Sequence, residues 1–84
     1  TSKSTVRIYP NPNTGIFNLE MPSATKGSIE LYNINGKKLH QQIIQYNTKP
    51  QQINVENLLD GIYFVIVRNE SGRIANTIKM VIAN

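Results

Sequence analysis

Hydrophobic side chains in this sequence recur at every second position, in short runs that turn-forming residues interrupt. Successive side chains of a β-strand point to opposite faces of a sheet, so a period of two predicts strands with one buried face. The runs begin near Val6, Ile16, Ile29, Leu39, Ile53, Ile62 and Ile74. Seven strands at intervals of roughly 8–12 residues are typical of an all-β sandwich or barrel, and no segment shows the period of a helix.

Two runs depart from simple alternation. Residues 62–67 are apolar throughout, which predicts a strand buried on both faces with Tyr63 in the core. In the last run Ile74, Ile78 and Met80 alternate regularly, and this places the polar Asn76 on the core side. A β-bulge at Asn76, or a strand that begins later, would resolve the conflict.

Turn signals separate the runs. Proline fixes φ and removes a donor, while glycine permits a positive φ, so the sequence PNPNTG at 10–15 predicts an irregular loop. The pair Asn35-Gly36 predicts a tight hairpin turn. Before Asp60-Gly61, either Leu58 or Leu59 is expected to cover one end of the core.

The composition offers little for catalysis. A chain of 84 residues forms one domain and leaves no room for a deep cleft beside its core. Cysteine is absent, His40 is the one histidine, Asp60 is the one aspartate, and no G-x-S-x-G turn occurs. We therefore expect no enzyme and no cofactor, with His40 an exposed strand residue beside Lys38 and Gln41.

Other ligands have weak support. Asn11, Asn13 and Asp60 carry the oxygen ligands that calcium prefers, but asparagines in turns commonly bond their own backbone. The net charge of +4 comes from scattered residues, which argues against a nucleic-acid surface. No apolar run approaches the roughly 20 residues of a membrane helix.

Four motifs in a fixed order resemble a known family. They are Tyr9-Pro10-Asn11-Pro12-Asn13-Thr14-Gly15-Ile16-Phe17, Leu31-Tyr32-Asn33-Ile34-Asn35-Gly36-Lys37, Leu58-Leu59-Asp60-Gly61-Ile62-Tyr63-Phe64-Val65 and Ile78-Lys79-Met80-Val81-Ile82. Each motif alone is weak. Together, across nearly the whole chain, they resemble the type A C-terminal sorting domain of the type IX secretion system of Bacteroidetes, the Por secretion tail.

The resemblance implies both a fold and a function. Domains of this family are Ig-like antiparallel β-sandwiches of about seven strands at the C-terminus of secreted enzymes and adhesins. They direct the cargo from the periplasm through the outer membrane. A sortase-like peptidase at the cell surface then typically removes them, and the cargo is often attached to lipopolysaccharide. The first residue is Thr1 and not Met, so we expect residues 1–5 to be a linker remnant and residues 6–84 to be the sorting domain.

The resemblance also implies which residues matter. Its C-terminal segment is important for recognition, so the predicted signal comprises Lys79, Met80, Val81, Ile82, Ala83 and Asn84. Alternation exposes Lys79, and a lone lysine there would equally serve to block aggregation along an edge strand. The remaining motif residues are predicted to shape turns and core: Pro10, Asn11, Pro12, Gly15, Asn35, Gly36, Asp60, Gly61 and Tyr63.

A carbohydrate-binding or adhesion module of similar fold is the alternative. Such modules usually expose tryptophan for stacking on sugars, and this sequence has none. A spacer domain is a further alternative, though it would need a linker after the last strand. An exposed edge strand would also permit a weak homodimer by edge pairing.

Overall fold

The computed structural model describes residues 6–21, 26–44 and 50–84, and the expected linker remnant at residues 1–5 lies outside them. The described residues form no helix. The strands are β1 (Arg7–Tyr9), β2 (Ile16–Glu20), β3 (Gly27–Asn33), β4 (Lys38–Ile44), β5 (Gln51–Asn54), β6 (Gly61–Asn69) and β7 (Ile74–Ile82). The all-β prediction with seven strands is confirmed.

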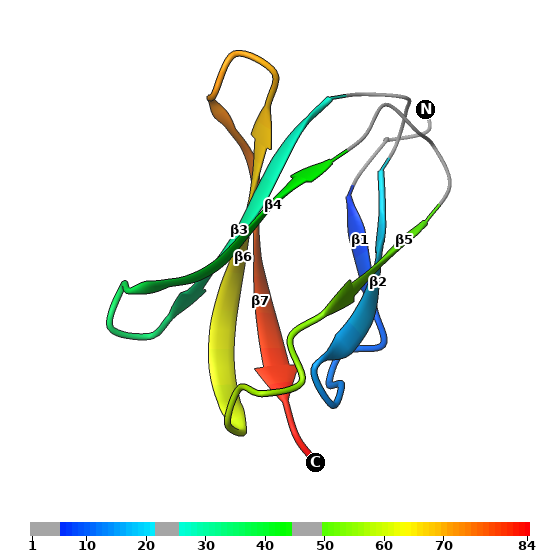
Figure 1. Ribbon diagram of the computed structural model, residues 1–84, viewed down its shortest axis with the longest axis vertical. Helices are drawn as coiled ribbons and strands as arrows, with labels where there is room; N and C mark the ends of the chain where they lie inside the picture. Colours follow the sequence, from blue (N-terminus) through cyan, green and yellow to red (C-terminus); the bar gives the residue numbers. More distant parts are fainter. Residues whose placement is uncertain (1–5, 22–25, 45–49) are drawn as a thin grey trace.

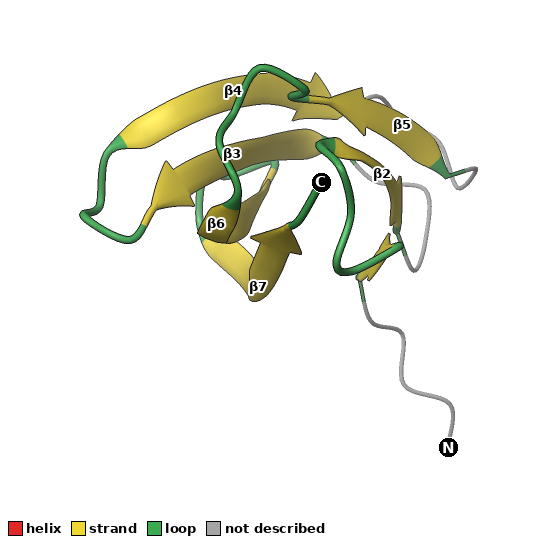
Figure 2. Ribbon diagram, turned by 90° about the horizontal axis from the view of Figure 1, so that it is seen from below, coloured by secondary structure: helices red, strands yellow, loops and turns green. Residues whose placement is uncertain are grey.

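The strands form two antiparallel sheets that face each other as a sandwich (Figure 1). One sheet has the order β1-β2-β5 and the other has the order β4-β3-β6-β7. Figure 2 shows the same two layers from below, with the end of the chain between them. β7 is therefore an edge strand of the larger sheet.

Every second residue of the strands points into the space between the sheets. The most deeply buried side chains are Phe17, Leu19, Ile29, Leu31, Ile44, Ile53, Val65, Val67, Met80 and Ile82. Leu58 packs against this core and Leu59 is exposed, which settles the choice between the two leucines. The period of two in the sequence therefore arises because one face of each strand packs into a single continuous core.

β6 corrects the prediction of a strand buried on both faces. Tyr63, Val65 and Val67 are buried between the sheets, as expected for that face. On the other face Phe64 is half-buried and Ile62 is 43% exposed. The reason is that none of the described strands forms a second layer over this outer face, so only neighbouring side chains of the same sheet shield it.

A β-bulge lies immediately before Asn76, which stays on the core side opposite Val67. Val67 pairs with Asn76, whereas Arg68 pairs with Ile74, so β7 contributes an extra residue, Ala75, at this point. The bulge is confirmed, and the strand does not begin later. It also turns Ile74 to the outer face, where it is 54% exposed, contrary to the expected alternation.

A second bulge lies in β4. Leu31 pairs with His40, and the next residue of β3 pairs with Lys38, so Leu39 is the extra residue. Leu39 packs against the core, whereas Ile43 is 68% exposed on the outer face. The prediction of an exposed His40 is wrong, because the bulge turns its ring inward; it is half-buried, with Nε2 3.2 Å from Oε1 of Gln42.

Two hairpins of the larger sheet use the same turn. In the first, the N–H of Gly36 donates to the carbonyl of Asn33 at 3.0 Å, and Gly36 has φ +86°. Asn35-Gly36 therefore marks the predicted hairpin but does not form the centre of a two-residue turn. The side chain of Asn33 accepts from the N–H groups of Asn35 and Lys37.

Asn69 repeats this arrangement at the other hairpin. Its side-chain oxygen accepts from the N–H groups of Ser71 and Arg73, and its carbonyl accepts from Gly72. Asn33 and Asn69 were not predicted to form turns. The signal was the shared spacing of asparagine, glycine three residues later and a basic residue immediately after it.

Candidate functional site

The predicted recognition segment, Lys79–Asn84, spans the end of β7 and the residues that follow it. Its side chains divide between the two faces of the strand. Met80 and Ile82 are 0% and 1% exposed and belong to the core. Lys79, Ala83 and Asn84 are exposed and Val81 is half-buried, so these residues are the part of the segment that a partner can reach.

The loop at residues 10–15 runs along the free edge of this segment, although it connects β1 and β2 of the other sheet (Figure 1). The N–H of Asn13 donates to the carbonyl of Val81 at 3.0 Å, and the N–H of Ala83 donates to the carbonyl of Asn13 at 2.8 Å. These two bonds form an isolated parallel bridge between Asn13 and Ile82. The loop therefore ties the two sheets together at the end of β7.

Asn11 extends this contact with its side chain. Its Nδ2 donates to the carbonyl of Lys79 at 2.9 Å, and its Oδ1 accepts from the N–H of Val81 at 3.0 Å. A carboxamide carries the same donor and acceptor as a peptide group, so Asn11 pairs with the strand edge as a neighbouring backbone would. The paired residues are 68 and 70 positions apart in the sequence.

Asn13 holds the loop in shape. Its side chain is buried, donates to the carbonyl of Pro10 at 3.0 Å and accepts from the N–H of Gly15 at 2.8 Å. The Tyr9-Pro10 and Asn11-Pro12 peptide bonds are both cis. These contacts agree with a structural role for the loop residues.

Gly15 brings the loop close to the chain after β5. Its φ is +103°, and a Cβ atom there would lie 2.9 Å from the Cα of Glu56. The carbonyl of Gly15 accepts from the N–H of Val55 at 2.6 Å. Any larger residue would have to displace this backbone, so the structure explains why the motif has glycine here.

Asp60 holds Asn84, the second residue after the end of β7. Its carboxylate accepts from the backbone N–H of Asn84 at 3.3 Å and from the side-chain Nδ2 at 2.7 Å. Nearby, the hydroxyl of Tyr63 donates to the carbonyl of Leu59, which fixes the preceding loop. The recognition segment is thus held at both ends, by Asn11 and by Asp60.

Apolar side chains surround an open hollow beside this segment. Ile34, Leu59 and Ile62 are 68%, 82% and 43% exposed, and they line a volume of about 210 Å³ together with Asp60. Ile62 pairs directly with Val81, so the apolar surface continues onto the recognition segment.

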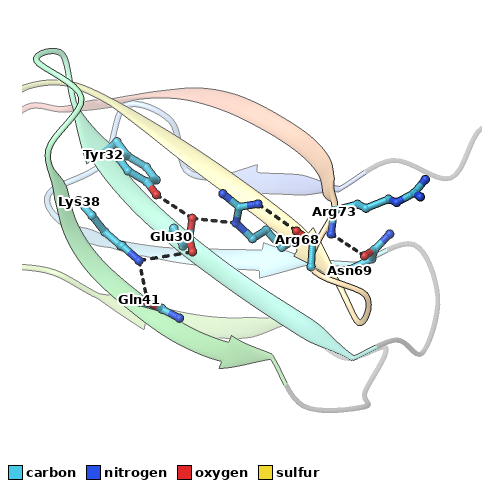
Figure 3. Close-up of polar contacts among 8 residues, drawn as sticks. Glu30, Tyr32, Lys38, Gln41, Arg68, Asn69 and Arg73 are labelled. Atoms are coloured by element: carbon cyan, nitrogen blue, oxygen red, sulfur yellow. Dashed lines mark hydrogen bonds and ion pairs between the residues drawn. The ribbon is translucent and has the colours of Figure 1, made fainter.

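A charged cluster lies elsewhere on the outer face of the same sheet (Figure 3). Glu30 accepts from Nε of Arg68 at 3.0 Å and from the hydroxyl of Tyr32 at 2.9 Å, and Nζ of Lys38 lies 3.6 Å from it. Burial alone would raise the pKa of Glu30. The hydrogen bonds from Arg68 and Tyr32 and the charges of Arg68 and Lys38 outweigh burial and lower the pKa.

The residues considered as calcium ligands are engaged with the protein itself. The side-chain oxygens of Asn11 and Asn13 accept backbone N–H groups, and Asp60 accepts from Asn84. Within residues 6–21, 26–44 and 50–84, no three acidic, histidine or cysteine residues cluster as a metal site would require. The same part of the chain has no helix that is long and apolar enough to cross a membrane.

Comparison with known families identifies the domain. The family model described as "Secretion system C-terminal sorting domain" matches residues 7–83, and no curated protein matches the sequence. The chain belongs to this family, whose members are sorting signals of the type IX secretion system of Bacteroidetes. The predicted family and the predicted sorting function are therefore confirmed, and the segment that ends β7 is part of a sorting domain. Cleavage at the cell surface stays a prediction.

Proposed function

We propose that this domain, without catalytic activity of its own, carries an N-terminal cargo protein from the periplasm through the outer membrane, and that a peptidase at the cell surface then removes it. Its partners are components of the type IX secretion machinery and the surface sortase. The proposal assigns recognition to the exposed residues of Lys79–Asn84.

One observation carries this assignment. The exposed residues Lys79, Ala83 and Asn84 and the half-buried Val81 lie on a short stretch that the loop at residues 10–15 and Asp60 hold in one conformation. A partner that binds a fixed surface does not have to order it on binding, which favours affinity. The other chemical groups support a role without catalysis, because His40 contacts Gln42 and Asp60 holds Asn84.

The structure dictates how the assignment should be tested. Deletion of Lys79–Asn84 would remove the core residues Met80 and Ile82, and loss of export would then report unfolding. Charge reversal of the exposed Lys79 avoids this difficulty. Lys79→Glu would be compared with Lys37→Glu, which changes an exposed lysine in the first hairpin turn.

Both variants and the wild type would be fused to a fluorescent reporter and expressed in a Bacteroidetes host with an active type IX system. We expect export of the wild type and of Lys37→Glu, with retention of Lys79→Glu in the periplasm and normal unfolding of the purified domain. If Lys79→Glu were exported as efficiently as Lys37→Glu, Lys79 would have no part in recognition. Retention of the folded wild-type fusion in the periplasm would refute the proposed route.

A further inference from the structure

We infer that the secretion partner recognises Lys79–Asn84 as a preassembled surface and not by adding a β-strand to the edge of β7, and that Asn11 is the residue that positions this surface. The inference rests on the proposed function. It adds the mode of recognition, the chemistry of the partner and a residue outside the recognition segment.

Four outward-facing backbone groups of the segment are already bonded, which blocks strand addition along it. A partner strand would bind the outward-facing N–H and C=O groups of the edge strand. Here the carbonyl of Lys79 and the N–H of Val81 are bonded to Asn11, and the carbonyl of Val81 and the N–H of Ala83 are bonded to Asn13. A strand could be added only by displacing the whole loop.

The remainder of β7 is a poor template. By the alternation of an antiparallel pair, Thr77 is the next residue whose backbone groups face the free edge. Two residues before it, the bulge at Ala75 interrupts the regular ladder. A bulge in an edge strand twists it away from pairing, and a single regular residue provides too few hydrogen bonds for a stable added strand.

The partner must therefore recognise the side chains of the segment and not its backbone. Lys79 and Val81 lie on the outer face beside their cross-strand partners, Phe64 and Ile62. Among the residues that the structure describes, Lys79 makes no ion pair. This combination fits a partner protein whose surface presents apolar side chains around a carboxylate. The carboxylate would pair with Lys79, and the apolar contacts would exclude water from the pair.

Asn11 fixes the register of this surface from outside it. It is exposed, and its side-chain bonds reach only the backbone of Lys79 and Val81. Loss of its carboxamide leaves every side chain of the recognition segment unchanged. A defect caused by Asn11→Ala in a folded domain would therefore arise from the position of the segment.

The test uses the same reporter fusion with four variants. Asn11→Ala removes both hydrogen bonds, and Asn11→Asp keeps the acceptor for Val81 but cannot donate to Lys79. Asn57→Ala is the matched control, since Asn57 is an exposed loop asparagine whose side chain makes no hydrogen bond with the described residues. Ile29→Val, in the core, provides a small loss of stability that leaves the surface intact.

We expect export of Asn11→Ala to fall about tenfold, the factor that corresponds to about 1.4 kcal/mol and so to the loss of two exposed hydrogen bonds of modest net strength. Asn11→Asp should be exported no better than Asn11→Ala, because its second carboxylate oxygen would face the carbonyl oxygen of Lys79. Asn57→Ala and Ile29→Val should be exported within about twofold of the wild type. Amide hydrogen exchange on the purified Asn11→Ala domain should show faster exchange at Val81 and unchanged exchange in β3 and β6.

The outcomes separate the two proposals. If the wild-type fusion is not exported, the proposed function fails and this inference fails with it. If the wild type is exported and Asn11→Ala matches Asn57→Ala, only the positioning role is refuted. Enhanced export of Asn11→Ala would show that a freed edge is preferred and would establish strand addition. An equal defect in Asn11→Ala and Ile29→Val would assign the effect to stability alone.

Discussion

The two ends of β7 are built differently. At its start, Ile74 and Ala75 are exposed, Ala75 is the extra residue of a bulge, and Ile74 pairs with Arg68 of β6. At its end, Met80 and Ile82 fill the core, β6 pairs on one side, and the loop at residues 10–15 pairs on the other. One strand thus combines a weakly held beginning with an end that is fixed in three directions.

This difference shows that position in the same strand does not imply equal stability. Segments with few buried contacts and exposed hydrogen bonds open locally, whereas segments tied into the core open only when the domain unfolds. We expect the start of β7 to exchange its amide protons by local opening and the end to exchange by global unfolding. Four substitutions test this contrast, from the largest expected effect to the smallest.

The largest effect is expected at Met80. Met80→Ala leaves a cavity between the sheets at a side chain that is fully buried, and such changes typically cost about 2–5 kcal/mol of unfolding free energy. Urea unfolding followed by circular dichroism measures it. A cost under about 1 kcal/mol would mean that the end of β7 is not anchored by the core, because cavities in close-packed interiors are always felt.

A substitution at Asn13 tests how far the loop at residues 10–15 stabilises the end of β7. Asn13→Ala removes the acceptor for Gly15 and the donor to Pro10, and it leaves the loop backbone without its internal support. Loss of a buried polar side chain with two partners should cost about 1–3 kcal/mol. Hydrogen exchange should also show faster exchange at Ala83, which bonds to the carbonyl of Asn13. If the amide of Ala83 were as protected in Asn13→Ala as in the wild type, the loop would not stabilise the end of β7.

A substitution at Glu30 tests how far its ion pair with Arg68 stabilises the start of β7. Glu30 holds Arg68, which pairs with Ile74 across the bulge and also donates to the carbonyl of Gly72 at 2.9 Å. Glu30→Gln removes the charge and keeps an acceptor, so we expect a loss of about 1 kcal/mol at neutral pH, reduced by the partial exposure of Arg68 and Lys38.

The pH dependence gives this prediction a distinct signature. The pKa of Glu30 lies below its ordinary value of 4.5, so its contribution to stability is present above that value and is lost as the pH falls through the lowered pKa. The difference between wild type and Glu30→Gln should therefore be constant at neutral pH and shrink in acid. A difference that does not shrink as the pH falls would assign the effect to packing.

The smallest effect is expected at Ile74. Ile74→Thr keeps a β-branched residue at an exposed strand position, so the unfolding free energy should change by less than about 0.5 kcal/mol. Thermal unfolding of Ile74→Thr and of Met80→Ala under the same conditions compares the two ends of the strand directly. A cost near that of Met80→Ala would remove the distinction between the two ends of the strand.

Local patterns in the sequence predicted most of the fold. Period-two alternation located the strands, and turn residues located the hairpins, because both depend on neighbours in the chain. The bulge at Asn76 was also visible, since a polar residue interrupted the apolar face. The bulge at Leu39 was not visible, because Leu39 and Ile43 alternate as residues of one apolar face would, although the bulge places them on opposite faces.

The contacts that organise the candidate site could not be predicted locally. Asn11 and Asp60 suggested turns, and nothing in their surroundings indicates partners at Val81 and Asn84. Such pairs arise only after the two sheets are folded together. The burial of Met80 and Ile82 did follow from alternation, and it restricts the surface that a partner can touch.

The bonds from Asn11 and Asn13 have a consequence for how the domain is completed. They join residues 11 and 13 to residues 79–83, so the first loop cannot reach its final form until the last strand has been synthesised and has docked on β6. Contacts between such distant positions are slow to form, because a long stretch of chain must be closed before they bring any stability. A chain that breaks off before residue 79 would lose the last strand and would also leave the first loop without its partner.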